Sequence, residues 1–231
     1  HITGTGITTF TGTAANIATV VATEADSGNN KINLDTDFSA TVDAGSVAAG
    51  DLNSINAATI TNVNALGVTE LTGLASVINT LVSNEKDLGD GVNLDSDYTA
   101  TITDTSVTAN VLNLLNANVP GLVTATSVTT IIGTAAEINT LLENEGDSGN
   151  KINLDGDFSV TVSAGSATAA QLNTINSATT SLVTATAVTA ITGTAADIAT
   201  LTAAEGDSGN KVNLDTDFTA TVDAGSVAAA D

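Results

Sequence analysis

Apolar and polar residues alternate along residues 152–162, which is the pattern of a strand with one face buried. The apolar positions are Ile152, Leu154, Phe158, Val160 and Val162. Polar residues occupy most of the positions between them and would face the other way. The pattern predicts one half-buried strand over the whole of residues 152–162.

A different period follows, and it indicates short helices. Thr134-Ala-Ala-Glu137 is a capping box, in which the threonine hydroxyl accepts from the third backbone N–H and the glutamate reaches back. Ala135, Ile138, Leu141 and Leu142 then fall on one helical face. The same design recurs from Thr194 to Leu201 and from Thr13 to Val20.

The whole pattern repeats with a fixed period, because the motif Asn-Leu-Asp-x-Asp begins at Asn33, Asn93, Asn153 and Asn213. A fixed period of this kind indicates a stacked array in which each unit buries its apolar face against its neighbours. A second capped helix begins at Thr168, between the helix starts at Thr134 and Thr194. We therefore predict an α/β solenoid of stacked parallel strands and short capped helices, with each 60-residue repeat made of two βα half-units. Whether one repeat forms one coil or two stays open.

Residues 1–231 are interpreted as a single array of nearly four units, without atypical capping repeats at its ends. Solenoids normally need polar caps to remain monomeric and dissolved. The expectation is either a piece of a longer array or a subunit that continues end to end into another copy.

Stacking of the units would place one aromatic residue per repeat in the interior and one pair of aspartates outside. The predicted core ladder consists of Phe38, Tyr98, Phe158 and Phe218. The external pairs are Asp35/Asp37, Asp95/Asp97, Asp155/Asp157 and Asp215/Asp217.

Charge excludes some partners. With 26 acidic residues against four lysines and no arginine, the net charge is −22, which disfavours nucleic acid because phosphate contacts need clustered Lys and Arg. An anionic membrane would also repel the chain. There is no cysteine for a disulfide framework and no apolar run as long as a membrane span, so no membrane insertion is expected.

Calcium is the sharpest chemical hypothesis, because several carboxylate and amide oxygens gather within a short segment beside turn-forming glycines, and calcium takes about six to eight such oxygens. The candidate ligands are Glu24, Asp26, Asp35, Asp37, Asp95, Asp97, Glu145, Asp147, Asp155, Asp157, Glu205, Asp207, Asp215 and Asp217. Lys31, Lys151 and Lys211 supply one positive charge per unit against about four acids. The alternative is a solvated acidic face whose Asp and Gly residues form turns.

The sequence also bears on two further functions. Thr-x-Thr pairs such as Thr184/Thr186 and Thr124/Thr126 suggest an ice-binding array, although threonine also favours strands for ordinary packing reasons. Enzymatic activity has no candidate residues, because the single histidine is His1, cysteine is absent, and no acid or serine stands in a position that the repeats do not copy.

The elements Gly-Thr-Ala-Ala-x-Ile-x-Thr-Leu and Asn-Leu-Asp-x-Asp-Phe resemble the repeat tracts of very large bacterial cell-surface and adhesin-like proteins, including those of cyanobacteria. The resemblance covers the whole chain and implies an extracellular scaffold, stalk or filament with no catalytic residues. The resulting prediction is an extracellular or cell-surface structural rod that joins itself head to tail into a filament or surface layer. A calcium-stabilised spacer within a large adhesin is the alternative.

Overall fold

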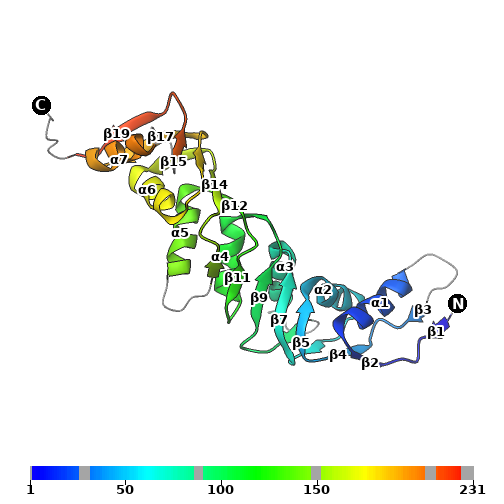
Figure 1. Cartoon of the computed structure of the whole chain (residues 1–231). Coiled ribbons are helices and arrows are strands. Elements are labelled where there is room, and N and C mark those ends of the chain that lie inside the picture. The colour runs from blue at the N-terminus through cyan, green and yellow to red at the C-terminus, as the bar shows by residue number, and fades with distance from the viewer. Residues whose placement is uncertain (1, 26–31, 86–90, 147–151, 206–211, 225–231) are drawn as a thin grey trace, which may run out of the picture. The chain divides into compact units, whose positions relative to one another are not determined.

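The computed structural model describes residues 2–25, 32–85, 91–146, 152–205 and 212–224, in two compact units (Figure 1). Unit 1 comprises His1–Thr103 and Leu114–Thr124, and unit 2 comprises Asp104–Asn113 and Ala125–Asp231. The helix α4 (Ala109–Asn118) is divided between the two.

The elements of unit 1 are β1 (Ile2–Gly4), β2 (Thr9–Gly12), α1 (Ala14–Ala25), β3 (Ile32–Leu34), β4 (Ser39–Val42), β5 (Gly45–Ala48), α2 (Ala49–Ala58), β6 (Val63–Ala65), β7 (Val68–Gly73), α3 (Ala75–Glu85), β8 (Val92–Leu94), β9 (Thr99–Ile102) and, except for its last residue, β11 (Val123–Ala125). Those of unit 2 are β10 (Ser106–Thr108), β12 (Thr130–Gly133), α5 (Ala135–Gly146), β13 (Ile152–Leu154), β14 (Ser159–Val162), β15 (Gly165–Thr168), α6 (Ala169–Ala178), β16 (Val183–Ala185), β17 (Val188–Gly193), α7 (Ala195–Glu205), β18 (Val212–Leu214) and β19 (Thr219–Val222).

Two kinds of coil alternate along the chain. A short coil has two strands followed by a helix, as in β6, β7 and α3, and a long coil has three strands followed by a helix, as in β3, β4, β5 and α2. One short and one long coil make up each repeat, so the question left open by the sequence is answered: a repeat contains two coils. The predicted α/β fold with parallel strands, short helices and two βα half-units is confirmed.

The sheets run diagonally across these coils. In unit 2 a five-stranded parallel sheet has the order β10-β12-β14-β16-β18. In terms of coils, these are the last strand of a long coil, the second of a short coil, the middle of a long coil, the first of a short coil and the first of a long coil. The sheets β2-β4-β6-β8 and β5-β7-β9-β11 of unit 1 follow the same rule. Each long coil therefore starts a new sheet with its last strand.

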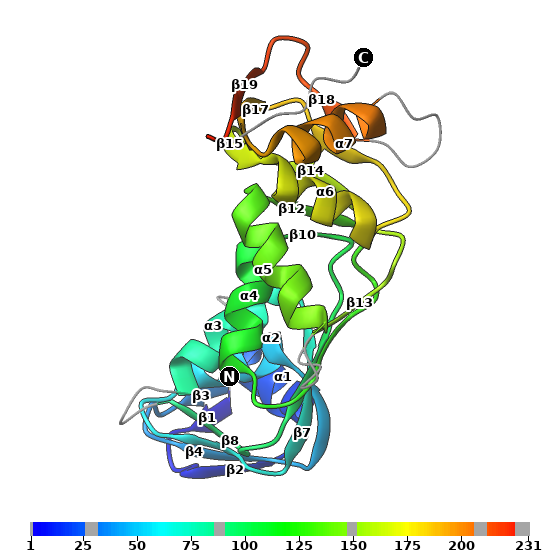
Figure 2. The same cartoon turned by 90° about the vertical axis from the view of Figure 1, so that its left-hand side faces the viewer.

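Every paired strand finds its partner nearby in the sequence. The shortest separation along the chain is that between partners such as Ala40 and Val63. The longest is that between partners such as Thr9 and Ser39. In unit 2, β15, β17 and β19 lie side by side next to α6 and α7 (Figure 2). Within each unit, the strands of a coil thus pair with strands of the described coils next to it in the sequence.

The prediction of one continuous strand over residues 152–162 is wrong. β13 ends at Leu154 and β14 begins at Ser159, with a turn over Asp155, Gly156 and Asp157 between them. In the equivalent turns, aspartate side chains accept hydrogen bonds from the turn's own backbone, at 3.2 Å from Thr36 N to Asp35 and 2.6 Å from Ser96 N to Asp95. These bonds compete with the hydrogen bonds of a strand ladder. A turn therefore forms here although the apolar and polar residues continue to alternate.

The core lies between the helices and the strands. On α6 the buried residues are Ala169, Leu172 and Ile175, and on α2 they are Ala49, Leu52 and Ile55. The helical face predicted for α5 is also buried: Ala135, Ile138, Leu141 and Leu142.

The predicted caps form. Glu137 N donates to Thr134 Oγ1 at 3.2 Å, and Thr134 N donates to the Glu137 carboxylate at 2.9 Å. Thr168 and Gln171 make the same reciprocal pair, and Thr194 accepts from Asp197 N at 3.1 Å.

Asparagines connect successive helices at one position of the repeat. The Nδ2 of Asn53, Asn113 and Asn173 donates to the carbonyl group of Val77, Glu137 and Asp197, at 3.0, 2.9 and 3.0 Å. Each accepting carbonyl belongs to the first turn of the helix that follows. The helix of a long coil is thus fixed to that of the next short coil by a side-chain hydrogen bond as well as by apolar contact.

The carbonyl group before each middle strand is also satisfied in every repeat where the structure describes both partners. Buried Thr59 and Thr179 donate their hydroxyls to the carbonyls of Phe38 and Phe158. The second repeat has Val119 instead, and there the Gly121 backbone N–H donates to the Tyr98 carbonyl at 3.1 Å. A Cβ at Gly121 would lie 2.7 Å from that carbonyl oxygen, so glycine is required for this close approach.

Candidate functional site

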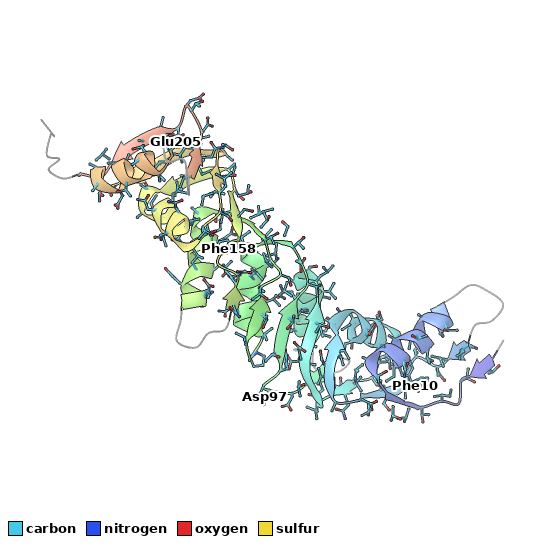
Figure 3. All side chains as sticks on the ribbon, viewed as in Figure 1. Phe10, Asp97, Phe158 and Glu205 are labelled. Atoms are coloured by element: carbon cyan, nitrogen blue, oxygen red, sulfur yellow. The ribbon has the colours of Figure 1, made fainter. Side chains whose placement is uncertain are left out.

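The acidic pairs lie in the turns that precede the middle strand of each long coil. Asp37, Asp97, Asp157 and Asp217 are exposed, as are Asp35 and Asp155, whereas Asp95 and Asp215 are partly exposed. Figure 3 labels Asp97 at such a turn, just before β9. In the last of these turns, Asp217 N lies 3.4 Å from Asp215 Oδ1 and Thr216 Oγ1 donates to Asp217 at 2.8 Å. The carboxylates therefore organise the turns themselves.

The described residues do not bring three acidic groups close enough to hold a metal ion. Three of the predicted ligands, Asp26, Asp147 and Asp207, lie outside the described residues. So do all four lysines: Lys31, Lys86, Lys151 and Lys211. Calcium binding stays a prediction.

Two of the glutamates at the ends of the short-coil helices make hydrogen bonds to the following coil. Glu145 is half-buried; burial raises the pKa of its carboxyl group, and a hydrogen bond from the Leu154 backbone N–H partly opposes that shift. One repeat earlier, Tyr98 Oη donates to Glu85 at 3.3 Å, and burial together with the Glu85 charge raises the pKa of Tyr98. These carboxylates connect the end of a helix to the strands of the following coil. Glu205, at the corresponding position of α7, is exposed (Figure 3).

The predicted core ladder is distributed over separate sheets. Phe38, Tyr98 and Phe158 are buried, and Phe218 is partly exposed. They precede the middle strands of successive long coils, and a short coil lies between one and the next. The aromatic contact that the structure describes joins Phe38 to Phe10 of the preceding short coil, edge to face, with ring centroids 5.0 Å apart.

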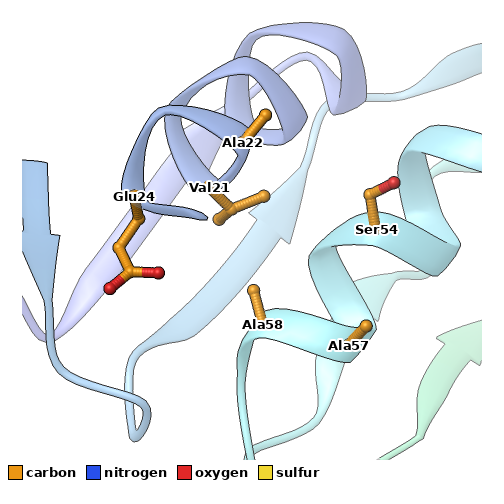
Figure 4. Close-up of a pocket in the computed structure, with 6 residues that line it drawn as sticks. All are labelled: Val21, Ala22, Glu24, Ser54, Ala57 and Ala58. Atoms are coloured by element: carbon orange, nitrogen blue, oxygen red, sulfur yellow. The ribbon is translucent and has the colours of Figure 1, made fainter. Parts of the chain in front are cut away.

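A hollow of about 390 Å³ lies between α1 and α2 (Figure 4). Its lining consists of Val21, Ala22, Glu24, Ser54, Ala57 and Ala58. In Figure 4, Val21 on α1 lies opposite Ala58 on α2, and Glu24 stands at the end of α1. Small side chains on both helices leave this space, and Glu24 is the one charged group among the described residues that line it. No pattern in the sequence indicated this hollow.

Hydroxyl groups form rows on the exposed sheet face, but they bond to the protein. Ser39, Thr99, Ser159 and Thr219 donate to the carbonyls of Thr8, Thr69, Thr129 and Thr189, at 3.2, 3.3, 3.0 and 3.1 Å. Glu70 interrupts one row, between Ser46 and Thr99, and Ile132 interrupts another, between Thr108 and Thr161.

The strand β19 exposes positions that are buried in every earlier copy. Val222 is 47% exposed, whereas the corresponding Val42, Ile102 and Val162 are 5%, 0% and 1% exposed. Ala220 is exposed although Ala40, Ala100 and Val160 are buried. In those earlier copies the next coil covers the strand. The described residues therefore present an uncovered apolar edge at β19.

An uncovered edge also lies at β1 and β2. Ile7 is 39% exposed, whereas Val68, Val128 and Val188 at the same position are at most 1% exposed. Phe10 is partly exposed where Leu71, Ile131 and Ile191 are buried. The first described coil thus offers an apolar surface on the side where later short coils contact a preceding long coil.

Comparisons with known proteins found no matching family model, no matching curated protein and no matching solved structure. Within the described ranges, no helix is long and apolar enough to cross a membrane.

Proposed function

We propose that this chain is an extracellular structural protein whose coils continue from one copy into the next, so that copies assemble end to end into a filament or surface layer. The observation that carries the proposal is the exposure of Ala220 and Val222 on β19, at positions buried in all earlier copies. An unpaired strand edge with exposed apolar residues is a template for association. Contact of this head-to-tail kind, without closure, produces open filaments.

The location outside the cell is supported by composition. The chain contains only four lysines and no arginine, which leaves few sites for trypsin-like proteases. The resemblance of its repeats to bacterial cell-surface tracts agrees with this setting. Immunogold labelling of intact and permeabilised producer cells tests the location, because an extracellular protein is labelled in both.

Sedimentation velocity and negative-stain electron microscopy over a range of protein concentrations test the assembly. We expect species that grow with concentration and filaments with a regular axial repeat. Val222→Asp should abolish them while the far-UV circular dichroism spectrum stays unchanged, because Val222 is already exposed. Thr161→Asp, which adds the same charge at an exposed position of β14, is the matched control and should leave assembly intact. Monomers at every concentration of the unmodified chain would refute the proposal.

A calcium-stabilised spacer within a larger adhesin is the second candidate. It is favoured by the four acidic pairs, which recur once in every repeat of a chain with 26 acidic residues and only four lysines. If calcium binds there, millimolar calcium should raise the melting temperature and chelation should reverse the rise, with magnesium as the control ion. An unchanged melting temperature would leave the aspartates as turn-forming residues on a solvated face.

Ice binding is the weakest candidate. The hydroxyl rows are engaged with backbone carbonyls and interrupted by Glu70 and Ile132, so they do not offer an unbroken array to solvent. Measurement of thermal hysteresis tests it directly, and we expect none.

A further inference from the structure

The strand pairing inside the chain follows a fixed rule at the step from a long coil to a short coil. The middle strand of the long coil pairs in parallel with the first strand of the next short coil, in β4 with β6, β9 with β11, and β14 with β16. The register is the same each time, because Ala40 faces Val63, Ala100 faces Val123 and Val160 faces Val183. The chain therefore makes this step in one way only among the described residues.

Two strands among the described residues are suited to the same step and do not make it. β19 is a middle strand that pairs with β17 on one side, and β1 is a first strand that pairs with β3 on one side. In each case, no described strand pairs with the other edge. In the sequence, Thr219-Ala220-Thr221 repeats Thr99-Ala100-Thr101. Ile2 and Thr3 occupy the places of Val63 and Asn64.

We infer that β19 of one copy pairs in parallel with β1 of a second copy of this chain, with Ala220 opposite Ile2 and Thr221 opposite Thr3. The inference rests on the proposed end-to-end assembly and specifies its partner strand, direction and register. Backbone hydrogen bonds along the strands supply attraction, as in strand addition generally. Ala220 and Val222 become covered as their counterparts in earlier copies are.

Charge favours this contact over a symmetric contact between two β19 edges. Residues 2–23 contain no charged side chain, whereas Asp215, Asp217 and Asp223 surround β19. A contact between two C-terminal edges would bring six carboxylates together, and a contact between β19 and β1 opposes them to a neutral surface. Every described strand pair is also parallel, which a symmetric contact would break.

Cysteine cross-linking tests the register, because the natural chain has no thiol. Paired parallel strands lie about 4.8 Å apart, within the Cα separation of about 4.4–6.8 Å that a disulfide tolerates. The double variant Thr3→Cys/Thr221→Cys should form a ladder of covalent dimers, trimers and longer species under mild oxidation. A mixture of the two single variants should give heterodimers and no longer species.

Two control variants define the outcomes. Thr41→Cys/Asn64→Cys reproduces the same pairing inside one chain and should form an intramolecular disulfide. Thr3→Cys/Thr219→Cys moves the pair to the next position on the same face of β19 and should cross-link at least tenfold more slowly. Equal or faster linkage of the shifted pair would overturn the register while assembly itself stands.

The remaining outcomes separate the inference from the proposed function. If the double variant closes into a cross-linked monomer, the second copy is excluded as the partner. If it forms no covalent species while the internal control does, and the unmodified chain still assembles in sedimentation, the inferred strand contact is wrong and the assembly is real. If neither linkage nor assembly occurs, both fail.

Discussion

At the scale of single residues, the repeats solve one packing problem in two ways. The carbonyl of Phe38 or Phe158 accepts a hydrogen bond from a buried threonine hydroxyl, and the carbonyl of Tyr98 accepts one from the Gly121 backbone. A buried carbonyl without a donor costs about 1–3 kcal/mol. The second repeat has Val119 where the first and third have Thr59 and Thr179, and its Gly121 supplies the hydrogen bond that the threonine hydroxyl supplies in them.

Gly121→Ala should be destabilising, because the new Cβ would lie 2.7 Å from the Tyr98 carbonyl oxygen and 3.0 Å from Thr99 Cγ2. Overpacking of this kind costs about 1–3 kcal/mol. Gly156→Ala is the matched control, because its Cβ would meet nothing within 4 Å, and its effect should stay within about 0.5 kcal/mol. Urea denaturation followed by circular dichroism measures both. Equal midpoints for the two variants would contradict the steric argument.

The half-buried carboxyl group of Glu145 should make the stability of the fold depend on pH. Its carboxyl pKa is raised by burial, so protonation favours the folded state, and the charged form lowers stability once the pH exceeds both the unfolded and the folded pKa. Glu145→Gln removes that charge and should raise the melting temperature at neutral pH. The difference from the natural chain should shrink as the pH falls through the raised pKa and vanish once the pH is below the unfolded pKa as well.

Glu143→Gln is the control for this measurement, since it removes one negative charge at a nearby exposed position of the same helix. It should change the melting temperature less than Glu145→Gln at neutral pH. If the two variants behave alike, the effect reflects net charge rather than burial of Glu145.

At the scale of elements, capping threonines mark the starts of several helices, but a helix can begin at the same repeat position without one. Thr134 and Thr168 complete reciprocal caps with Glu137 and Gln171, whereas α3 has Leu74 at the corresponding position, 49% exposed. α3 nevertheless runs from Ala75 to Glu85 and is as long as α7. Burial of its apolar face against neighbouring coils compensates for the missing threonine.

Opposite changes in stability are expected at these two caps. Thr134→Ala should lower the free energy of unfolding by about 1 kcal/mol, because it removes the acceptor for the Glu137 N–H. Leu74→Thr should raise it by up to about 1 kcal/mol, since it adds such an acceptor and gives up an exposed leucine. Thermal and urea denaturation check both signs. A stabilising Thr134→Ala or a destabilising Leu74→Thr would show that packing, not capping, dominates there.

Elements were predictable from sequence to the extent that local physics determines them. The helix starts at Thr134, Thr168 and Thr194 followed from the capping pattern, and their apolar faces followed from spacing. The turn at Asp155-Gly156-Asp157 was missed, because the apolar alternation continues on both sides of it while the aspartates bond the turn backbone. The strand order was beyond reach, since Thr130 gives no local sign that it pairs with both Ser106 and Ser159.

The candidate site was less predictable. The exposure of the aspartates follows from their alternation with buried residues, but the half-buried state of Glu145 depends on how its helix meets the next coil. The apolar edge at β19 (Thr-Ala-Thr-Val) differs by one residue from the covered strand β4 (Ser-Ala-Thr-Val). Only the absence of a covering coil among the described residues distinguishes it.

At the scale of the whole molecule, stability depends on contacts between neighbouring coils. A short coil shares two strand positions with each long coil beside it, as β6 and β7 do with β8 and β9. Two short coils placed next to each other would share only one strand position. In the natural chain β9 pairs with β7 on one side and with β11 on the other, so without the long coil β7 would meet β11 and not β12. The alternation of coils is thus a condition for complete pairing.

Deletions test this condition. Removal of residues 75–134 deletes one whole repeat, joins Leu74 to Ala135 and keeps the alternation, so cooperative thermal unfolding should persist. Removal of residues 75–108 deletes one long coil, places two short coils together and should lower the melting temperature by more than the larger deletion does. Circular dichroism melts of both variants measure the difference. A higher melting temperature for the smaller deletion would refute the two-position rule.

The short reach of the strand pairing, in which every partner lies in an adjacent coil, has a consequence for synthesis. Contacts between residues this close in the sequence form quickly and need no distant segment of the chain. Each coil can therefore dock as soon as it leaves the ribosome or an export channel, onto the coil that emerged before it. Such a chain can fold from one end during its own delivery, and its length does not slow the folding of any single step.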